Sequence, residues 1–287
     1  MSKSIGGIKM LDCILDGLID TLKLIPYLWV TFLLLEFLEH KLDKKNEKIL
    51  RKNQKLGPLI GSLLGALPQC GFSTMAASLF SSHIITMGTL IAVFLSTSDE
   101  MLPIMLSEKT SFLEILRIIG VKVLIGIIIG FLVDFLYKRK DKKEEIHHMC
   151  EKEHCDCEEE GIFLSSLKHT LKIAFFIVIA NIVINSIIYW IGEESLKNLL
   201  LNKNIITYFI ASLIGLIPNC ASSVIMTELY LSKLISIGTL FSGLLTGSGL
   251  GILLLFRNNE NQKENIQVLS IIYIVGVIVG ILVDIII

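Results

Sequence analysis

Pro68-Gln69-Cys70 and Pro218-Asn219-Cys220 lie 150 positions apart, and each motif interrupts an apolar stretch of the chain. When residues 57–106 are laid over residues 207–256 without a gap, 15 of the 50 positions are identical. Shared apolar composition alone does not account for so many identities. The sequence therefore predicts two copies of one structural unit, each broken at the same place by a helix-breaking proline next to a cysteine.

The composition is that of an integral membrane protein. Of the 287 residues 53% are hydrophobic, and the mean hydropathy is +0.70. A helix needs about 20 apolar residues to cross a hydrocarbon layer about 30 Å thick. Four stretches approach or exceed this length, namely 22–38, 111–137, 171–192 and 267–287. The net charge is −1 and the basic residues lie beside these stretches, which argues for membrane lipid and against nucleic acid as a partner.

The apolar and charged stretches divide the chain into four parts. Residues 1–21 contain a short amphipathic pattern and no apolar core with a cleavage site, so we expect an N-terminal amphipathic helix and no cleaved signal peptide. Residues 22–137 form the first membrane repeat and residues 166–287 form the second. Between them, residues 138–165 are polar and rich in His and Cys, and we expect a cytoplasmic linker.

Within each repeat two apolar segments are too short for two full crossings. In the first repeat these are 57–67 and 71–80, separated by Pro68 and Gly71. The economical interpretation is a re-entrant helical hairpin, because broken backbone is tolerated at membrane depth only when it is buried in protein or lines a wet cavity. A single kinked crossing helix is the alternative for each pair.

The loop charges favour hairpins and an inverted topology. Residues 41–55 carry seven Lys or Arg, and the linker opens with the basic run 138–143. Both loops are therefore predicted to be cytoplasmic, which requires an even number of crossings between them. One hairpin followed by two full crossings meets this requirement. We expect an all-α polytopic protein made of two inverted-topology repeats of about five membrane helices each, with re-entrant broken hairpins.

The two hairpin tips are candidates for the substrate pathway. Their thiols suit soft ions such as Cu(I), Zn(II), Cd(II) or trivalent arsenic, while the neighbouring amides add oxygen ligands. Each cysteine alone is also an ordinary small buried residue, so the repetition at a helix break carries the prediction. The tip residues are Pro68, Gln69, Cys70 and Ser73 in the first repeat, and Pro218, Asn219, Cys220 and Ser223 in the second.

A polar stretch, Ser98-Asp99-Glu100, interrupts the apolar run 84–106. Carboxylates inside a membrane segment are expensive and are functional by default. Ser and Thr before them and Pro103 after them favour local unwinding of the helix. The second repeat keeps the serine as Ser248 and lacks both acids, so the predicted site is asymmetric. A charged loop at the membrane edge is the alternative.

Two further groups have metal-binding composition. Glu36, Glu39 and His40 share one helix face at i, i+3 and i+4. Such a cluster can hold a divalent ion or relay protons. A solvated helix end is the alternative.

The linker contains three His and three Cys within eleven residues, without the spacing of a zinc finger. We expect a flexible metal chelator, and a polar tether without metal binding is the alternative. The linker ligands are His147, His148, Cys150, His154, Cys155 and Cys157.

Three stretches carry a family resemblance: 36–40, 57–73 and 95–103. They resemble the ten-span heavy-metal exporters, a family that is similar to arsenic permeases and whose members are often labelled manganese transporters. The resemblance spans nearly the whole chain. It implies ten membrane elements in a 5+5 arrangement and export of a toxic metal or metalloid.

Together these patterns predict a secondary transporter in the prokaryotic inner (cytoplasmic) membrane that exports a heavy metal or metalloid ion, coupled to protons through a membrane carboxylate. Manganese would bind Asp99, Glu100 and Gln69, whereas arsenic or copper would bind Cys70 and Cys220. We expect no enzymatic activity and no cofactor; a homo-oligomer is left open. The alternatives are a carrier of an organic or anionic substrate, a membrane metal sensor, and a thiol-redox protein.

Overall fold

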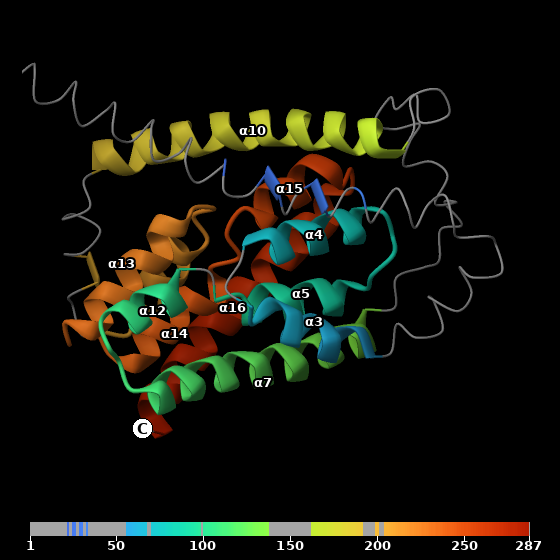
Figure 1. Ribbon diagram of the computed structural model, residues 1–287. Helices are drawn as coiled ribbons and strands as arrows, with labels where there is room; N and C mark the ends of the chain where they lie inside the picture. The colour runs from blue at the N-terminus through green and yellow to red at the C-terminus, as the bar shows by residue number, and fades with distance from the viewer. Residues whose placement is uncertain are drawn as a thin grey trace, which may run out of the picture. The chain divides into compact units, whose positions relative to one another are not determined.

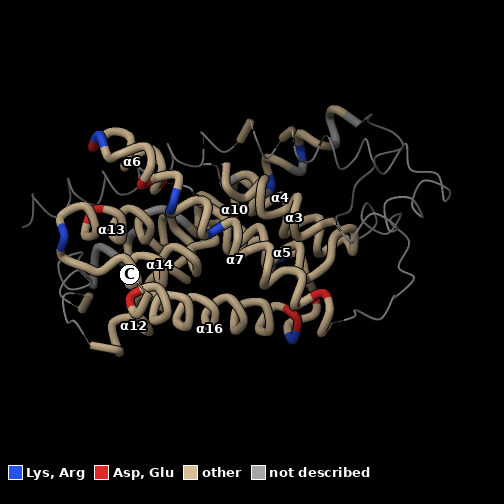
Figure 2. The backbone as a smooth tube through the Cα atoms, turned by 90° about the horizontal axis from the view of Figure 1, so that it is seen from below, with Lys and Arg blue, Asp and Glu red and all other residues tan. Residues whose placement is uncertain are grey.

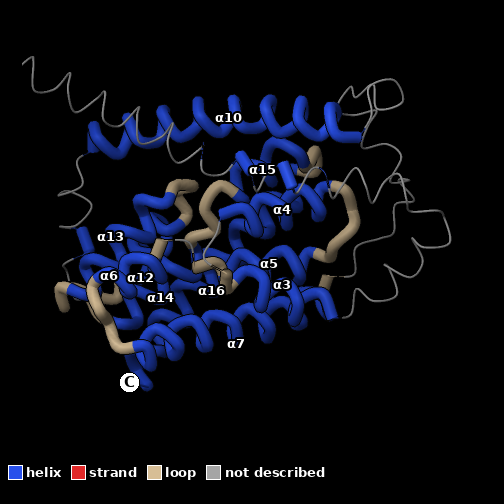
Figure 3. Tube along the Cα trace, in the orientation of Figure 1, coloured by secondary structure: helices blue, strands red, loops and turns tan. Residues whose placement is uncertain are grey.

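The computed structural model describes residues 56–67, 70–98, 100–137, 162–191, 199–200 and 204–286, together with six isolated helical positions between 22 and 33. Every regular element in this part of the chain is a helix (Figure 3). The predicted N-terminal helix and nearly all of the linker lie outside the described residues. The chain divides into two compact units: Met1–Glu47 with Glu144–Leu196, and Lys48–Lys143 with Lys197–Ile287.

In the first unit the main described element is α10 (Ile162–Ile191). Its segment Ser166–Ile184 is long and apolar enough to cross a membrane. The ring of Phe163 lies edge-on to the ring of Trp29, with centroids 4.9 Å apart and an interplanar angle of 85°. This arrangement of two aromatic rings ties the start of α10 to the segment that contains Trp29.

The second unit contains the same series of helices twice. The first series is α3 (Gly57–Gly65), α4 (Cys70–Ser81), α5 (Met87–Ser96), α6 (Met101–Ser107) and α7 (Phe112–Leu136). The second is α12 (Ile206–Gly215), α13 (Cys220–Leu231), α14 (Ile237–Thr246), α15 (Gly251–Asn258) and α16 (Gln262–Ile286). The bounds of α13, α14 and α16 equal those of α4, α5 and α7 shifted by 150, so the duplication seen in the sequence is also a duplication of structure.

The same local interactions end and begin the matching helices. His83 and Lys233 adopt left-handed backbone with φ of 61° and 58° directly after α4 and α13. Each helix then closes with a 6→1 bond, from Ile84 N to Leu79 O and from Leu234 N to Leu229 O, both at 2.9 Å. These are Schellman caps, which stop a helix and satisfy its last carbonyls.

Asp134 and Asp284 hold the long helices to the central ones. Asp134 accepts hydrogen bonds from the Thr86 hydroxyl at 2.7 Å and from Gly88 N at 2.8 Å, at the start of α5. Asp284 accepts from Tyr208 Oη at 2.7 Å, from Gly238 N at 2.8 Å and from the Ser236 hydroxyl, at the start of α14. Each carboxylate thus satisfies amide donors that a helix N-terminus leaves open.

The central helices α5 and α14 form the core of the second unit. Every residue of α5 and nearly every residue of α14 is buried. α3, α5 and α7 pack side by side (Figure 1), as do α12, α14 and α16. The two series are also interlocked, because α4 packs on α15, α13 packs on α6, and α5 packs on α14.

Small residues allow the central helices to approach their neighbours closely. A Cβ atom on Gly65 would lie 2.6 Å from Val93 O of α5, and one on Gly215 would lie 2.2 Å from Gly243 O of α14. Helix association inside a membrane relies on such close backbone contact, since lipid tails offer no hydrophobic driving force. Glycine is therefore required at both equivalent positions.

The outer surface of the long helices suits a lipid environment. Among the described residues, five helical segments are long and apolar enough to cross a membrane, including α7, α16 and the broken segments Met87–Ser107 and Ile237–Asn258. The α16 helix carries charged residues only near its ends (Figure 2). Large apolar side chains such as Phe135 and Ile285 are 79% and 73% exposed, which in water would be an unfavourable surface.

α3 and α4 are only 9 and 12 residues long, so neither is a full crossing. The two limbs of this pair pack chiefly on other helices: α3 on α5 and α7, and α4 on α15 and α5. The helices of the second pair, α12 and α13, are 10 and 12 residues long. Re-entrant hairpins and inverted topology stay predictions.

Candidate substrate site at the two helix breaks

Both central helices are interrupted at matching positions. α5 ends at Ser96 and α6 begins at Met101, while α14 ends at Thr246 and α15 begins at Gly251. The cap residues leave helical geometry, with φ −55° and ψ 130° at Thr97 and φ −73° and ψ 84° at Gly247. The unwinding predicted around residues 96–100 is therefore confirmed, and the second repeat unwinds at the same place.

Local chemistry explains the first break. The hydroxyls of Ser96 and Thr97 turn back onto the helix, donating to Ala92 O and Val93 O at 2.8 Å each. Pro103 lies in the first turn of α6, where its missing amide costs nothing, but its ring would clash with the carbonyl of residue 99 in a continuous helix. The break is thus encoded on both sides.

The second break uses glycine instead of proline. Gly249 has φ of 53°, a left-handed backbone conformation that residues other than glycine rarely adopt. The amide of Ser248 donates to Thr246 O at 3.0 Å. In a continuous helix the same amide would bond to Leu244 O. The carbonyl of Leu244 is consequently released from its helical partner.

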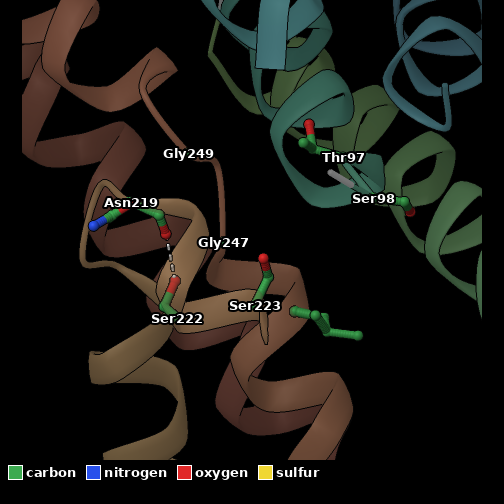
Figure 4. A pocket seen from close by; sticks show the side chains of 8 residues that line it. Thr97, Ser98, Asn219, Ser222, Ser223, Gly247 and Gly249 are labelled. Atoms are coloured by element: carbon green, nitrogen blue, oxygen red, sulfur yellow. Dashed lines mark hydrogen bonds between the residues drawn. The ribbon is translucent and has the colours of Figure 1, made fainter. Parts of the chain in front are cut away.

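A small cavity lies where the breaks meet the second tip (Figure 4). Its volume is about 10 Å³, which is roughly what one water molecule needs. The hydroxyls of Thr97, Ser98 and Ser222 donate to backbone carbonyls of their own segments. The lining residues are Thr97, Ser98, Asn219, Ser222, Ser223, Leu244, Gly247 and Gly249. Both repeats therefore contribute to one cavity.

Asn219 positions the tip of the second repeat. Its backbone is extended, with φ −149° and ψ 149°, and it caps α13. Its side-chain oxygen accepts from Ala221 N at 3.5 Å, and its backbone oxygen accepts from the Ser222 hydroxyl at 2.9 Å. Asn219 is only 8% exposed and Ser222 only 4%. An N-cap of this kind fixes the entry of the chain into the helix.

The structure brings together only part of the predicted site. Ser98, Asn219 and Ser223 line the cavity. Ser73 is fully buried and lies against α15. A Cβ atom added to Gly251 of α15 would lie 2.9 Å from the Cβ atom of Ser73. Glu100 is half-buried at the start of α6, and Pro218 is half-buried in the turn before α13.

The remaining predicted residues cannot be placed in the same way. Cys70 and Cys220 are the first residues of α4 and α13, and nothing further is described of their side chains. Pro68, Gln69 and Asp99 lie outside the described residues. So do all the predicted metal ligands: Glu36, Glu39, His40, His147, His148, Cys150, His154, Cys155 and Cys157. Within the described residues no group of three or more His, Cys, Asp or Glu side chains could hold a metal ion.

Lys122 is a residue beside the site that the sequence interpretation missed. Its side chain is 0% exposed, and its ammonium donates to Thr97 O and, at 3.1 Å, to Leu244 O. Both carbonyls belong to residues that line the cavity. A lone lysine in the middle of the apolar stretch 111–137 was the available signal, because an ionisable residue at membrane depth is a functional candidate by default.

A helical membrane protein whose two repeats each break a buried helix at one cavity has the architecture expected of a carrier for a small substrate. The family model described as "Putative, 10TM heavy-metal exporter" matches residues 9–207 and 158–287. The chain belongs to this family. The resemblance inferred from the motifs is thereby confirmed, and the family implies a metal ion as substrate. Comparison with curated proteins and with solved structures gave no match.

Proposed function

We propose that this protein is a secondary transporter that exports a heavy-metal or metalloid ion across the cytoplasmic membrane, with the cavity at the helix breaks as part of its substrate site. The observation that carries the proposal is that both repeats supply unwound backbone to a single cavity. In transporters built from inverted repeats, discontinuous helices form the site at the interface of the repeats. The two halves can then alternate around a fixed site.

The cavity lining supports a substrate that bonds to oxygen. Five of the lining residues carry a hydroxyl or amide oxygen, namely Thr97, Ser98, Asn219, Ser222 and Ser223. Oxygen ligands suit manganese, and a dehydrated ion is small enough for this cavity. Because the cavity accommodates about one water molecule, a compact inorganic species fits this conformation better than an organic substrate does.

The cysteines at the tips offer a second mode of binding within the same proposal. Cys220 directly follows Asn219, which lines the cavity, and Cys70 begins the matching helix of the first repeat. Thiolates would select soft ions such as arsenic(III), Cu(I) or Cd(II). Sulfur ligands favour soft ions and oxygen ligands favour manganese, so the transported element distinguishes these two modes of binding.

Proton coupling is assigned to the acids next to the first break. Glu100 is half-buried at the start of α6, and Asp99 precedes it in the sequence. Carboxylates inside a membrane segment are expensive, so they are functional candidates by default. The second repeat has Gly249 and Leu250 at the matching positions. One carboxylate-bearing break would exchange protons while the other break shapes the cavity.

The test compares cellular metal content by mass spectrometry in cells that express the wild type, Asn219→Leu or Asn204→Leu. The cells are exposed in parallel to manganese, zinc, copper, cadmium and arsenite. Asn219 lines the cavity and Asn204 is exposed before α12, so the same chemical change is made inside and outside the site. We expect the wild type and Asn204→Leu to lower the content of one element, and Asn219→Leu to lose this effect.

Asp99→Asn tests the proton coupling in the same assay. This variant is expected to block export while leaving the protein in the membrane.

Equal metal content in cells with the wild type and in cells without the protein, for every element, would contradict the proposed exporter function. Full activity of Asn219→Leu would remove the cavity from the pathway and leave the family function standing.

A further inference from the structure

A hydrogen bond joins the tip helix of the second repeat to the long helix of the first. The Tyr230 hydroxyl, in the last turn of α13, donates to Glu114 Oε1, in the first turn of α7, at 2.7 Å. Both side chains are half-buried. α13 directly follows Asn219, which lines the cavity. The bond therefore connects the first repeat to the helix that begins at the candidate substrate site.

The first repeat cannot form the equivalent bond. The positions that match Tyr230 and Glu114 are occupied by Phe80 and Glu264. Phe80 has no hydroxyl and its side chain is 0% exposed, so apolar burial stabilises the end of α4. The two tip helices thus end in different surroundings: α4 ends inside the core, whereas α13 ends on a polar bond between half-buried side chains.

One flank of the tip helix also differs between the repeats. Gly251 lets α15 lie close to α4, since a Cβ on this glycine would be 2.9 Å from the Cβ of Ser73. The matching residue of α6 is Met101, whose buried side chain occupies space that a glycine leaves open. α4 accordingly packs more extensively on α15 than α13 packs on α6. Near the helix end Ser78 is 2% exposed, whereas the matching Glu228 is exposed.

Close packing and a hydrogen bond respond differently when a helix shifts. A closely packed contact must repack as a whole, because protein interiors contain few voids. A hydrogen bond between two half-buried side chains can break and form again without such repacking. Elements that move during function are drawn from those with fewer buried contacts. Of the two tip helices, α13 is therefore the one that can be released.

The α13 helix connects this bond to the cavity. It has 12 residues, so it is about 18 Å long at a rise of 1.5 Å per residue. Asn219, at its N-terminal cap, lines the cavity together with Ser222 and Ser223 of its first turn. A helix of this length moves as one piece, so a shift at Tyr230 also displaces these three lining residues.

We propose that the hydrogen bond between Tyr230 and Glu114 is a releasable latch that positions the second tip at the cavity. With the latch closed, α13 holds Asn219 and the two serines of its first turn at the cavity. Release of the latch lets α13 move while α4 stays packed on α15, so the second tip opens the cavity and the first tip stays in place. The inference rests on the proposed function for the identification of the cavity as a substrate site.

The experiment measures amide hydrogen exchange by mass spectrometry in the purified full-length protein in detergent, without added metal. The wild type is compared with Tyr230→Phe, which removes one oxygen atom, and with Glu114→Met, which removes the acceptor. Tyr208→Phe is the matched control, because the Tyr208 hydroxyl also donates to a carboxylate at 2.7 Å, that of Asp284.

We expect Tyr230→Phe and Glu114→Met to raise the exchange rate along α13 by about fivefold, as the loss of one hydrogen bond predicts. The increase should include amides 224–227, in the half of α13 that is nearer the cavity, and α4 should be unchanged. Glu114→Gln keeps a carbonyl oxygen as acceptor and should exchange like the wild type. Tyr208→Phe should leave the exchange of α13 at the wild-type rate.

An unchanged exchange rate of α13 in Tyr230→Phe would overturn the proposal. An increase confined to the last turn would contradict it as well, since other contacts would then position the tip. An equal increase in α4 and α13 would show a general loss of stability and would exclude a latch. Because the measurement needs no metal and no transport, the latch and the exporter function can fail separately.

Discussion

At the scale of single residues, the most informative pair is Asp134 and Asp284. They occupy equivalent positions in the two repeats, 150 residues apart. The structure supports a structural role, since each carboxylate accepts hydrogen bonds at the start of a central helix. Each aspartate therefore joins the long helix of its repeat to the central helix.

Asp284→Ala tests this joint. The variant leaves Gly238 N and the Tyr208 hydroxyl without their acceptor, and loss of an N-terminal helix cap costs about 1 kcal/mol. We expect a lower Tm for the purified protein in detergent. Tyr208→Phe removes only one of the donors and should have a smaller effect. A Tyr208→Phe variant less stable than Asp284→Ala would contradict the role assigned to the carboxylate.

At the scale of elements, helices pack where small residues remove side chains from the contact. Gly215 approaches α14 so closely that a Cβ would lie 2.2 Å from Gly243 O. Gly120 is the matched contrast, because a Cβ there would meet no heavy atom within 4 Å. The two glycines look alike in the sequence and differ only in what the fold places against them.

Gly215→Ala should therefore separate α12 from α14 and lower the yield and Tm of the folded protein, with a cost of about 1–3 kcal/mol expected for overpacking. Gly120→Ala should leave both unchanged or slightly raise the Tm, since alanine is the better helix former. The measurement is fluorescence-detected gel filtration followed by thermal unfolding. Equal behaviour of the two variants would show that the close contact has no energetic weight.

At the scale of the whole molecule, the two series of helices are interlocked. α4 of the first repeat packs on α15 of the second, and α13 packs on α6. The hydroxyl of Tyr230 on α13 also donates to Glu114 on α7 at 2.7 Å. Neither repeat could complete its core alone, so the second compact unit is built from both.

Inverted topology predicts that matching loops lie on opposite sides of the membrane. Ser111 and Asn261 are equivalent positions 150 apart, and both are exposed. In chains without other cysteines, Ser111→Cys should react with an impermeant maleimide applied outside intact cells. Asn261→Cys should react only after permeabilisation. Labelling of both from the same side would contradict the inverted arrangement and the loop-charge argument for it.

The sequence by itself determined the duplication, the helical membrane class and the interruptions of the helices. These follow from spacing, apolar length, proline, glycine and hydroxyl side chains, which act locally along the chain. It also determined three residues that line the cavity: Ser98, Asn219 and Ser223.

Only the tertiary structure decided that the two breaks meet the second tip in one cavity, and that Lys122 bridges the carbonyls of Thr97 and Leu244. Lys122 lies 25 positions from Thr97 and 122 from Leu244. No pattern along the chain states which distant carbonyl an ammonium will reach, because that choice is made by the packing of helices from both repeats.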